Sequence, residues 1–270
     1  MHAINVRDPQ GALHRFVLRR HTLAAWLARE PDLARQEAFA LELLSASDTV
    51  APQLIAVDPD GSLAGTPSVL MSRLPGRLRV DTPVTNDYLS QLAAALPAIH
   101  EVQPPLSFTK LRRYYTYNDV DRLQVPDWSD EPTAWRSVIT AARAPKPPTA
   151  WTFIHRDYHP GNALWSRGRL TGIVDWINAS YGPPGIDLGH CRVNLAIVFG
   201  LDAADRFREA YLGLAESHPY QLHWDCLSAI ECLPAPPFVG QWLDGGRHDL
   251  TAEIARRRID SYVASLAAKL

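Results

Sequence analysis

The ten residues FIHRDYHPGN, at positions 153–162, place His155, Asp157, His159 and Asn162 close together directly after an apolar stretch. Side chains of these types serve two kinds of site. Imidazoles with a carboxylate bind zinc or iron. An aspartate followed five residues later by an asparagine is the pattern of a loop that catalyses phosphoryl transfer.

The first alternative is a transition-metal centre, which would make the protein a metal-dependent hydrolase. His155, Asp157 and His159 alternate, so an extended strand would point all three the same way. However, Pro160 and Gly161 follow at once and predict a loop, and the remaining histidines are scattered along the chain. A zinc or iron site is therefore the weaker interpretation of the segment.

The second alternative explains more residues. In the phosphoryl-transfer pattern, Asp157 orients the acceptor hydroxyl and takes its proton, and Asn162 binds Mg²⁺. The pattern also requires an acidic metal ligand after a downstream strand, and TGIVDW supplies Asp175 at the end of an apolar run. Carboxylate and amide oxygens are suitable ligands for Mg²⁺, and positioning with charge neutralisation would supply most of the catalysis.

Together these segments, IHRDYHPGNALW and GIVDWINASYGPPGIDLGH, resemble the signature region of the aminoglycoside phosphotransferase family, which includes antibiotic, choline and homoserine kinases. The tryptophan after Asp175 distinguishes this group from protein kinases, where Phe-Gly follows. The resemblance implies an α+β, protein-kinase-like fold of two lobes, with ATP or GTP and Mg²⁺ as cofactors and a small-molecule hydroxyl as acceptor. It also implies that His155 braces the loop and that Asp187 anchors it; His159 could contact the substrate or pack.

The same resemblance places a phosphate-binding basic residue on the strand HRFVLRR, paired with a glutamate of the following helix. Strand parity and the family's VLR pattern favour Arg19, with Arg20 as the alternative, and Glu37 fits the helix partner. Arginine in place of lysine would bind phosphate in a different geometry. Backbone groups from Ser72 to Leu74 are expected to bind the adenine edge.

The family carries a phosphate-covering flap before this strand, but only about 15 residues precede it here, with one glycine, Gly11, in an apparent hairpin turn. Most of the flap is therefore expected to be missing. Either the sequence starts late or the nucleotide lid is reduced. A reduced lid would weaken ATP binding and leaves open a nucleotide-binding pseudokinase.

Hydrophobic periodicity places these motifs on a small β-rich part and a larger helical part. We expect residues 1–73 to form a nucleotide-binding lobe, with strands at 14–20, 53–57 and 68–72 and a helix at 32–44 that Asp32 caps. The LPGR break then leads into a catalytic and substrate-binding lobe over 74–270. Its expected helices cover 86–100, 203–215 and the end from about Thr251, with short strands in TFIH, ALW and LTGIVDW.

Composition excludes several classes of protein. With 46% hydrophobic and 21% charged residues among 270, the chain is typical of a globular protein. A net charge of −2 argues against a nucleic-acid surface, and no apolar run is long enough to span a membrane. Three cysteines without CxxC spacing indicate reduced thiols. We therefore expect a cytoplasmic protein; no feature specifies its oligomeric state.

The acceptor is left open between two classes. A cationic acceptor, such as an aminoglycoside or an amino alcohol, would suit the acidic residues Asp225, Glu231, Asp244 and Asp249. An apolar acceptor such as a macrolide would suit the aromatic residues Trp224, Phe238 and Trp242.

Overall fold

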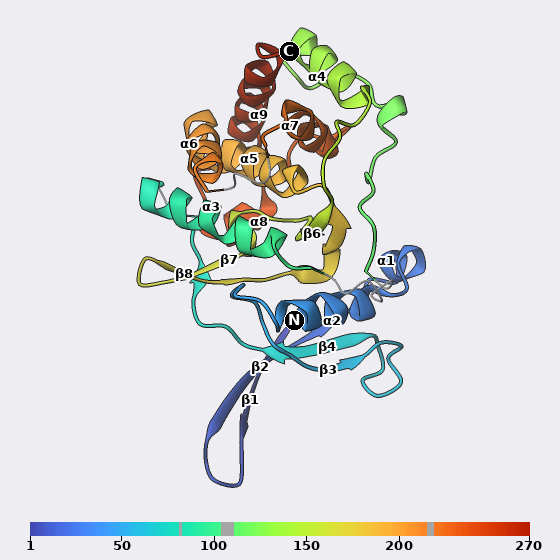
Figure 1. Ribbon diagram of the computed structural model, residues 1–270, viewed down its shortest axis with the longest axis vertical. Coiled ribbons are helices and arrows are strands. Elements are labelled where there is room, and N and C mark those ends of the chain that lie inside the picture. The colour runs from blue at the N-terminus through green and yellow to red at the C-terminus, as the bar shows by residue number, and fades with distance from the viewer. Residues whose placement is uncertain (81–82, 104–110, 215–218) are drawn as a thin grey trace.

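The computed structural model describes residues 1–80, 83–103, 111–214 and 219–270. Its first part is a four-stranded antiparallel sheet in the order β1-β2-β4-β3, on which α2 packs (Figure 1). The elements of this part are β1 (His2–Arg7), β2 (Leu13–Arg20), α1 (Ala24–Arg29), α2 (Leu33–Leu44), β3 (Leu54–Asp58) and β4 (Ser68–Ser72).

Strand β2 is the expected HRFVLRR strand, and it lies inside the sheet between β1 and β4. The expected hairpin before it is confirmed, because the turn closes with Gly11 at a φ of 87° and with Asp8 Oδ1 accepting the N–H of Ala12 at 2.8 Å. Successive side chains of a strand point to opposite faces. Arg19 and Arg20 therefore diverge, and Arg20 donates to the carbonyl oxygen of Ala64 at 3.3 Å.

Helix α2 confirms the helix expected at 32–44. The apolar stripe of Leu33, Ala40, Leu41 and Leu44 is buried, which is the driving force for its position on the sheet. Asp32 occupies the N-cap position, but its side chain makes no capping hydrogen bond. The expectation that Asp32 caps the helix is therefore wrong for its side chain.

The second part is mainly helical, with helices α4, α5, α6, α7 and α9 at the end of the molecule opposite the first sheet (Figure 1). Its elements are β5 (Arg77–Leu78), α3 (Asn86–His100), α4 (Pro132–Arg143), β6 (Thr152–Ile154), β7 (Ala163–Ser166), β8 (Arg169–Ile173), β9 (Ser180–Gly182), α5 (Gly185–Phe199), α6 (Leu201–Leu212), α7 (Leu222–Ala229), α8 (Gly240–Asp244) and α9 (Ala252–Ala267). Short 3₁₀ turns cover η1 (Val120–Arg122), η2 (Pro160–Asn162), η3 (Trp176–Asn178) and η4 (Ile230–Cys232).

Two of the expected helices of this part begin at side-chain caps. Thr85 accepts the N–H of Tyr88 at the start of α3, and Thr251 accepts the N–H of Ile254 at the start of α9. The helix expected at 203–215 is α6, and the last residue of that range lies outside the described residues. None of the helices in the described parts of the chain is long and apolar enough to cross a bilayer.

The strands of the second part form two small sheets around the motif segment. β6 pairs with β9, while β7 and β8 form a hairpin whose first strand also pairs with β5. The FIHRDYHPGN segment runs from β6 to β7, and Asp175 follows two residues after β8. The N–H of Val174 donates to the carbonyl oxygen of Asn162 at 2.9 Å, so the topology brings both motifs together. The predicted α+β class is confirmed; the boundary at 73/74 stays a prediction.

Candidate active site

Asp187, near the start of α5, holds the loop that follows β6. Its carboxylate is fully buried and accepts the backbone N–H groups of His155 at 2.8 Å and Arg156 at 2.7 Å. Nε2 of His100 lies 3.2 Å from the same carboxylate. Burial alone would raise the pKa of Asp187, but the hydrogen bond and charge of His100 outweigh burial and lower it. Asp187 thus stabilises the turn at Arg156, whose φ is 72°.

His155 connects the loop to the segment after β8 that carries Asp175. Its Nδ1 accepts the N–H of Asp157 at 3.2 Å, so the neutral ring bears its proton on Nε2, which donates to the carbonyl oxygen of Val174 at 3.0 Å. Both nitrogens of His155 are therefore engaged, Nδ1 within the loop and Nε2 with Val174. It lies where a bracing residue is needed and not where it could bind a metal.

The side chains of Asp157 and Asn162 contact each other. The Asn162 amide nitrogen donates to the carbonyl oxygen of Asp157 at 2.9 Å and to its Oδ2 at 3.3 Å. This arrangement fixes the orientation of the amide and leaves its oxygen as the atom that can bind a cation. Asp175 follows in a left-handed conformation, with a φ of 70°, and its side chain is 33% exposed.

Arg19 reaches this group from β2. Its Nη1 lies 2.6 Å from Asp175 Oδ1 and 3.2 Å from Glu37 Oε1. Burial raises the pKa of Glu37 to about 7, an effect that Arg19 opposes and the Asp175 charge reinforces. The structure thus brings Arg19, and not Arg20, to both the helix glutamate and the candidate metal ligand.

Three cavities connect these residues, and the first two lie between the two parts. One of about 340 Å³ is lined by groups from both parts, among them Val17, Arg19, Ser72, Leu74, Asn162 and Asp175. A second of about 310 Å³ is lined by Arg19, His21, Trp26, Asp157 and Asp175. A third, of about 110 Å³, is lined by Asp157, His159, Asn162, Asp175 and Trp242. Asp157, Asn162 and Asp175 therefore face one common cavity.

The sequence allows His159 either to contact the substrate or to pack. Its Nδ1 accepts the N–H of Gly161 at 3.0 Å, and its ring packs edge-on against Trp242, 5.4 Å away between centroids. Nε2 lies 3.5 Å from Asp157 Oδ1. Burial lowers the pKa of His159 to about 4, against the opposing charge of Asp157, so the ring is neutral beside the carboxylate.

The H-x-D-x-H metal set does not come together as the sequence pattern suggested, because His155 is engaged within the loop. Among the described residues, one group that could hold a metal consists of Asp157, His159 and His190, whose ligand atoms lie within 4.8 Å of one another. His190 is a residue that sequence reasoning missed. It stands three positions after Asp187 on α5, and residues at this spacing share a helix face. That spacing was the available signal.

Most of the acidic residues that could recognise a cationic acceptor form ion pairs with arginines of the same chain. Glu231 accepts hydrogen bonds from both terminal nitrogens of Arg156, at 2.6 and 3.0 Å, and buried Asp225 forms an ion pair with Arg192. Asp249 accepts from Arg247 at 2.8 Å, whereas Asp244 is exposed on α8. Of the aromatic candidates, Trp224 is buried, Phe238 is exposed, and Trp242 lines the smallest of the three cavities.

Asp157 itself is held ionised. Burial would raise its pKa, but the hydrogen bond and the charge of His190 outweigh burial and lower it well below the ordinary value. A carboxylate that is ionised at neutral pH, beside an amide, a second carboxylate and a cationic side chain, can orient a hydroxyl and hold a divalent cation.

Comparison with known proteins identifies the family of the chain. A family model described as the phosphotransferase enzyme family (APH) matches residues 4–229. Comparison with curated proteins gave no match.

Several solved structures share the fold. A thermostable mutant of the aminoglycoside phosphotransferase APH(4)-Ia, in complex with AMP-PNP and hygromycin B, has 16% identity and a TM-score of 0.61, over 100% of this chain and 95% of its own. The macrolide 2'-phosphotransferase MphH from Brachybacterium faecium has 20% identity and a TM-score of 0.58, over 95% and 88%. Amicoumacin kinase hAmiN has 14% identity and a TM-score of 0.57, over 97% and 84%. The kinase-like fold is confirmed, and because the family model covers most of its length, the chain belongs to the phosphotransferase enzyme family and is a kinase acting on hydroxyl groups of small molecules.

Proposed function

We propose that this phosphotransferase transfers the γ-phosphate of ATP, or of GTP, to a hydroxyl of a small molecule with Asp157 as base and Mg²⁺ bound by Asn162 and Asp175. One observation carries the proposal. Asp157, Asn162 and Asp175 line a common cavity, and Arg19, paired with Glu37, reaches the same place from the opposite part of the molecule.

The donor set fits magnesium. The Asn162 amide is turned so that its oxygen can bind a cation, and Asp175 adds a partly exposed carboxylate, which gives the hard oxygen ligands that Mg²⁺ requires. When bound, Mg²⁺ would neutralise charge on the phosphates. Arg19 is the cationic group placed to contact phosphate oxygens, and Glu37 holds its guanidinium in position.

Asp157 orients the acceptor. As an ionised carboxylate it accepts the hydrogen bond of the acceptor hydroxyl and directs the oxygen toward the γ-phosphorus. A bond forms between that oxygen and phosphorus, the bond from phosphorus to the bridging oxygen of the leaving ADP breaks, and Asp157 takes the hydroxyl proton. Because its pKa is low, the larger part of its effect is orientation of the hydroxyl.

The cavity of about 340 Å³ is the proposed nucleotide site, since Ser72 and Leu74 line it together with Arg19, Asn162 and Asp175. Structural neighbours solved with AMP-PNP support a nucleotide in this fold. For the acceptor, the pairing of Glu231, Asp225 and Asp249 with arginines removes three of the four carboxylates that could have recognised an amine. The acceptor of this chain therefore need not be strongly cationic.

The test is a panel of hydroxyl acceptors with γ-labelled ATP or GTP, with and without Mg²⁺. Hygromycin B, a macrolide and amicoumacin represent the substrates of the structural neighbours. We expect Mg²⁺-dependent transfer of label to at least one small-molecule alcohol. Nucleotide-dependent thermal stabilisation without product would favour the pseudokinase, and stoichiometric zinc in elemental analysis of the purified protein would favour the metal-dependent hydrolase.

A further inference from the structure

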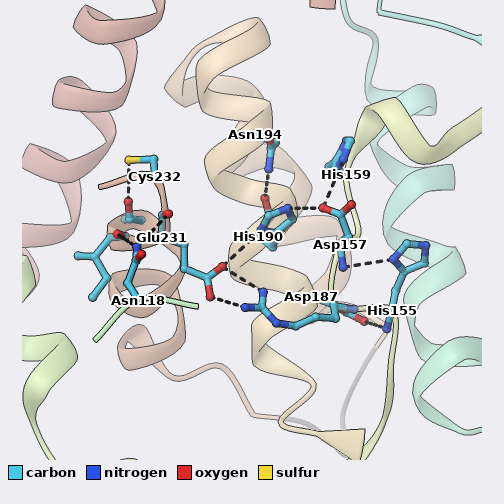
Figure 2. Close-up of polar contacts among 12 residues, drawn as sticks. Asn118, His155, Asp157, His159, Asp187, His190, Asn194, Glu231 and Cys232 are labelled. Carbon is cyan, nitrogen blue, oxygen red and sulfur yellow. Dashed lines mark hydrogen bonds and ion pairs between the residues drawn. The ribbon is translucent and has the colours of Figure 1, made fainter. Parts of the chain in front are cut away.

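His190 lies between two carboxylates. Figure 2 shows it on α5 with Asp157 on one side and Glu231 on the other. Its Nε2 lies 3.0 Å from Asp157 Oδ1, a hydrogen bond, and its Nδ1 lies 3.8 Å from Glu231 Oε2, an ion-pair distance. The imidazole thus joins the catalytic loop to η4, which follows α7.

Glu231 is itself held in place. Arg156, one residue before Asp157, binds both of its carboxylate oxygens, and the Arg156 guanidinium also lies over the rings of Tyr114 and Tyr117, at 4.9 and 4.3 Å from their centroids. From the other side, the Asn118 amide donates to the backbone carbonyl of Glu231 at 3.2 Å. This carboxylate therefore has a fixed position behind His190.

The surroundings of His190 favour its charged form. The charged or titratable groups that face it are Asp157, Glu231 and the neutral His159 ring, 5.8 Å away between centroids, with Arg156 beyond Glu231. Burial lowers the pKa of His190, but the hydrogen bond to Asp157 and the charge of Glu231 outweigh burial and raise it to about 9. At neutral pH the ring is therefore charged, with Nε2 hydrogen-bonded to Asp157 and Nδ1 at ion-pair distance from Glu231.

We propose that His190 is a positioning residue for phosphoryl transfer: its ring, held between Asp157 and Glu231, fixes the rotation of the Asp157 carboxylate that receives the acceptor hydroxyl. This inference rests on the proposed function. Because both nitrogens already bear protons, His190 cannot accept the proton that Asp157 takes, so it acts through geometry and charge and not as a relay.

The charge of His190 can be tested without an acceptor. Nitrogen NMR of ¹⁵N-histidine-labelled protein, with the His190 signals assigned by their loss in His190→Gln, should show both ring nitrogens protonated at pH 7. Glu231→Gln should move the pKa of His190 down toward its ordinary value of about 6.5. A neutral His190 ring at pH 7 in the wild type, or an unchanged pKa in Glu231→Gln, overturns the clamp.

The positioning role is tested by steady-state kinetics, with water as the acceptor in Mg²⁺-dependent ATP hydrolysis and with any alcohol from the panel that gives product. His190→Ala should lower kcat by about 10- to 100-fold with little change in KM for ATP, because misplacement of a catalytic group costs rate more than nucleotide binding. His190→Gln, whose amide can donate to Asp157 in place of Nε2, should recover most of the loss.

Asn194→Ala is the matched control, since that side chain lies one turn further on α5 and donates to the backbone carbonyl of His190 at 2.9 Å. Wild-type kcat in His190→Ala, or an equal loss in His190→Ala, His190→Gln and Asn194→Ala, overturns the positioning role. Complete absence of wild-type turnover refutes the proposed function and with it this kinetic role, while the NMR result still decides whether the imidazolium clamp exists.

Discussion

The Nη1 atom of Arg19 lies 2.6 Å from Oδ1 of Asp175, joining an interior strand of the N-terminal sheet to the segment that follows β8. The same nitrogen lies 3.2 Å from Oε1 of Glu37. One guanidinium thus forms ion pairs with two carboxylates that come from opposite parts of the molecule. We therefore propose that the stability of the fold and the binding of a nucleotide depend on the same guanidinium.

Replacing Arg19 by alanine should lower the stability of the fold and weaken the binding of ATP. Glu37 is 1% exposed and would be left buried without its cation, which costs on the order of 1–3 kcal/mol in the free energy of unfolding. Urea unfolding measures this loss, and nucleotide titration calorimetry should show weaker ATP binding. Arg20→Ala is the matched control, because exposed Arg20 donates to one backbone carbonyl on the other face of β2; it should stay within about 0.5 kcal/mol of wild type. Equal effects of the two substitutions would contradict this assignment.

Glu37 should make stability depend on pH. Its pKa rises from the ordinary 4.5 to about 7 on folding, so the folded state holds the proton more tightly than the unfolded chain. Stability linked to this group is therefore fully present below pH 4.5 and is lost as the pH rises through 7. Glu37→Gln removes the titration. Between pH 5 and pH 8 the metal-free wild type should lose on the order of 1–3 kcal/mol relative to Glu37→Gln.

The control for this pH dependence is Glu42→Gln, which changes an exposed residue of the same helix and should leave the wild-type profile intact. Denaturant unfolding of the three proteins at several pH values provides the comparison. Parallel pH profiles for wild type and Glu37→Gln would show that the Glu37 carboxyl does not titrate in this range.

Asp187→Asn should destabilise the protein by about 2–4 kcal/mol, because the fully buried carboxylate accepts two backbone N–H groups and contacts His100, and an amide cannot accept at both positions. Chemical unfolding measures the loss. Asp202→Asn, at an aspartate of α6 whose side chain is 81% exposed, should change stability by less than about 0.5 kcal/mol. Wild-type stability in Asp187→Asn would mean that the loop does not depend on this anchor.

The sequence was informative where the physical cause of a structure is local. Helices α2, α3 and α9 could be predicted because each buries one apolar stripe, and the loop around Asp157 because Pro160 and Gly161 directly follow it. Helix α5 was missed for the opposite reason. Most of its side chains are buried, on all faces, so its sequence carries no helical periodicity. Strand β9, with three residues, and α1, with no buried residue, likewise leave little pattern.

The parts of the site that sequence reasoning missed depend on tertiary packing. Nothing in the neighbourhood of Glu231 indicates that it binds Arg156, since the two residues are 75 positions apart. The exposed or buried state of a carboxylate, and hence whether it can meet a substrate, is decided by which helices pack together. For the same reason His190 could be read as a scattered histidine until α5 was placed against the loop.

The most direct test of the phosphotransfer site is the rate of Mg²⁺-dependent label transfer from γ-labelled ATP by wild type and by Asp157→Asn, with the free energy of unfolding measured for both. We predict that the variant stays folded and that its kcat falls by about 10²- to 10⁴-fold, because the amide neither takes the hydroxyl proton nor attracts it as a carboxylate does. Transfer at the wild-type rate by folded Asp157→Asn would contradict the site assigned to this enzyme.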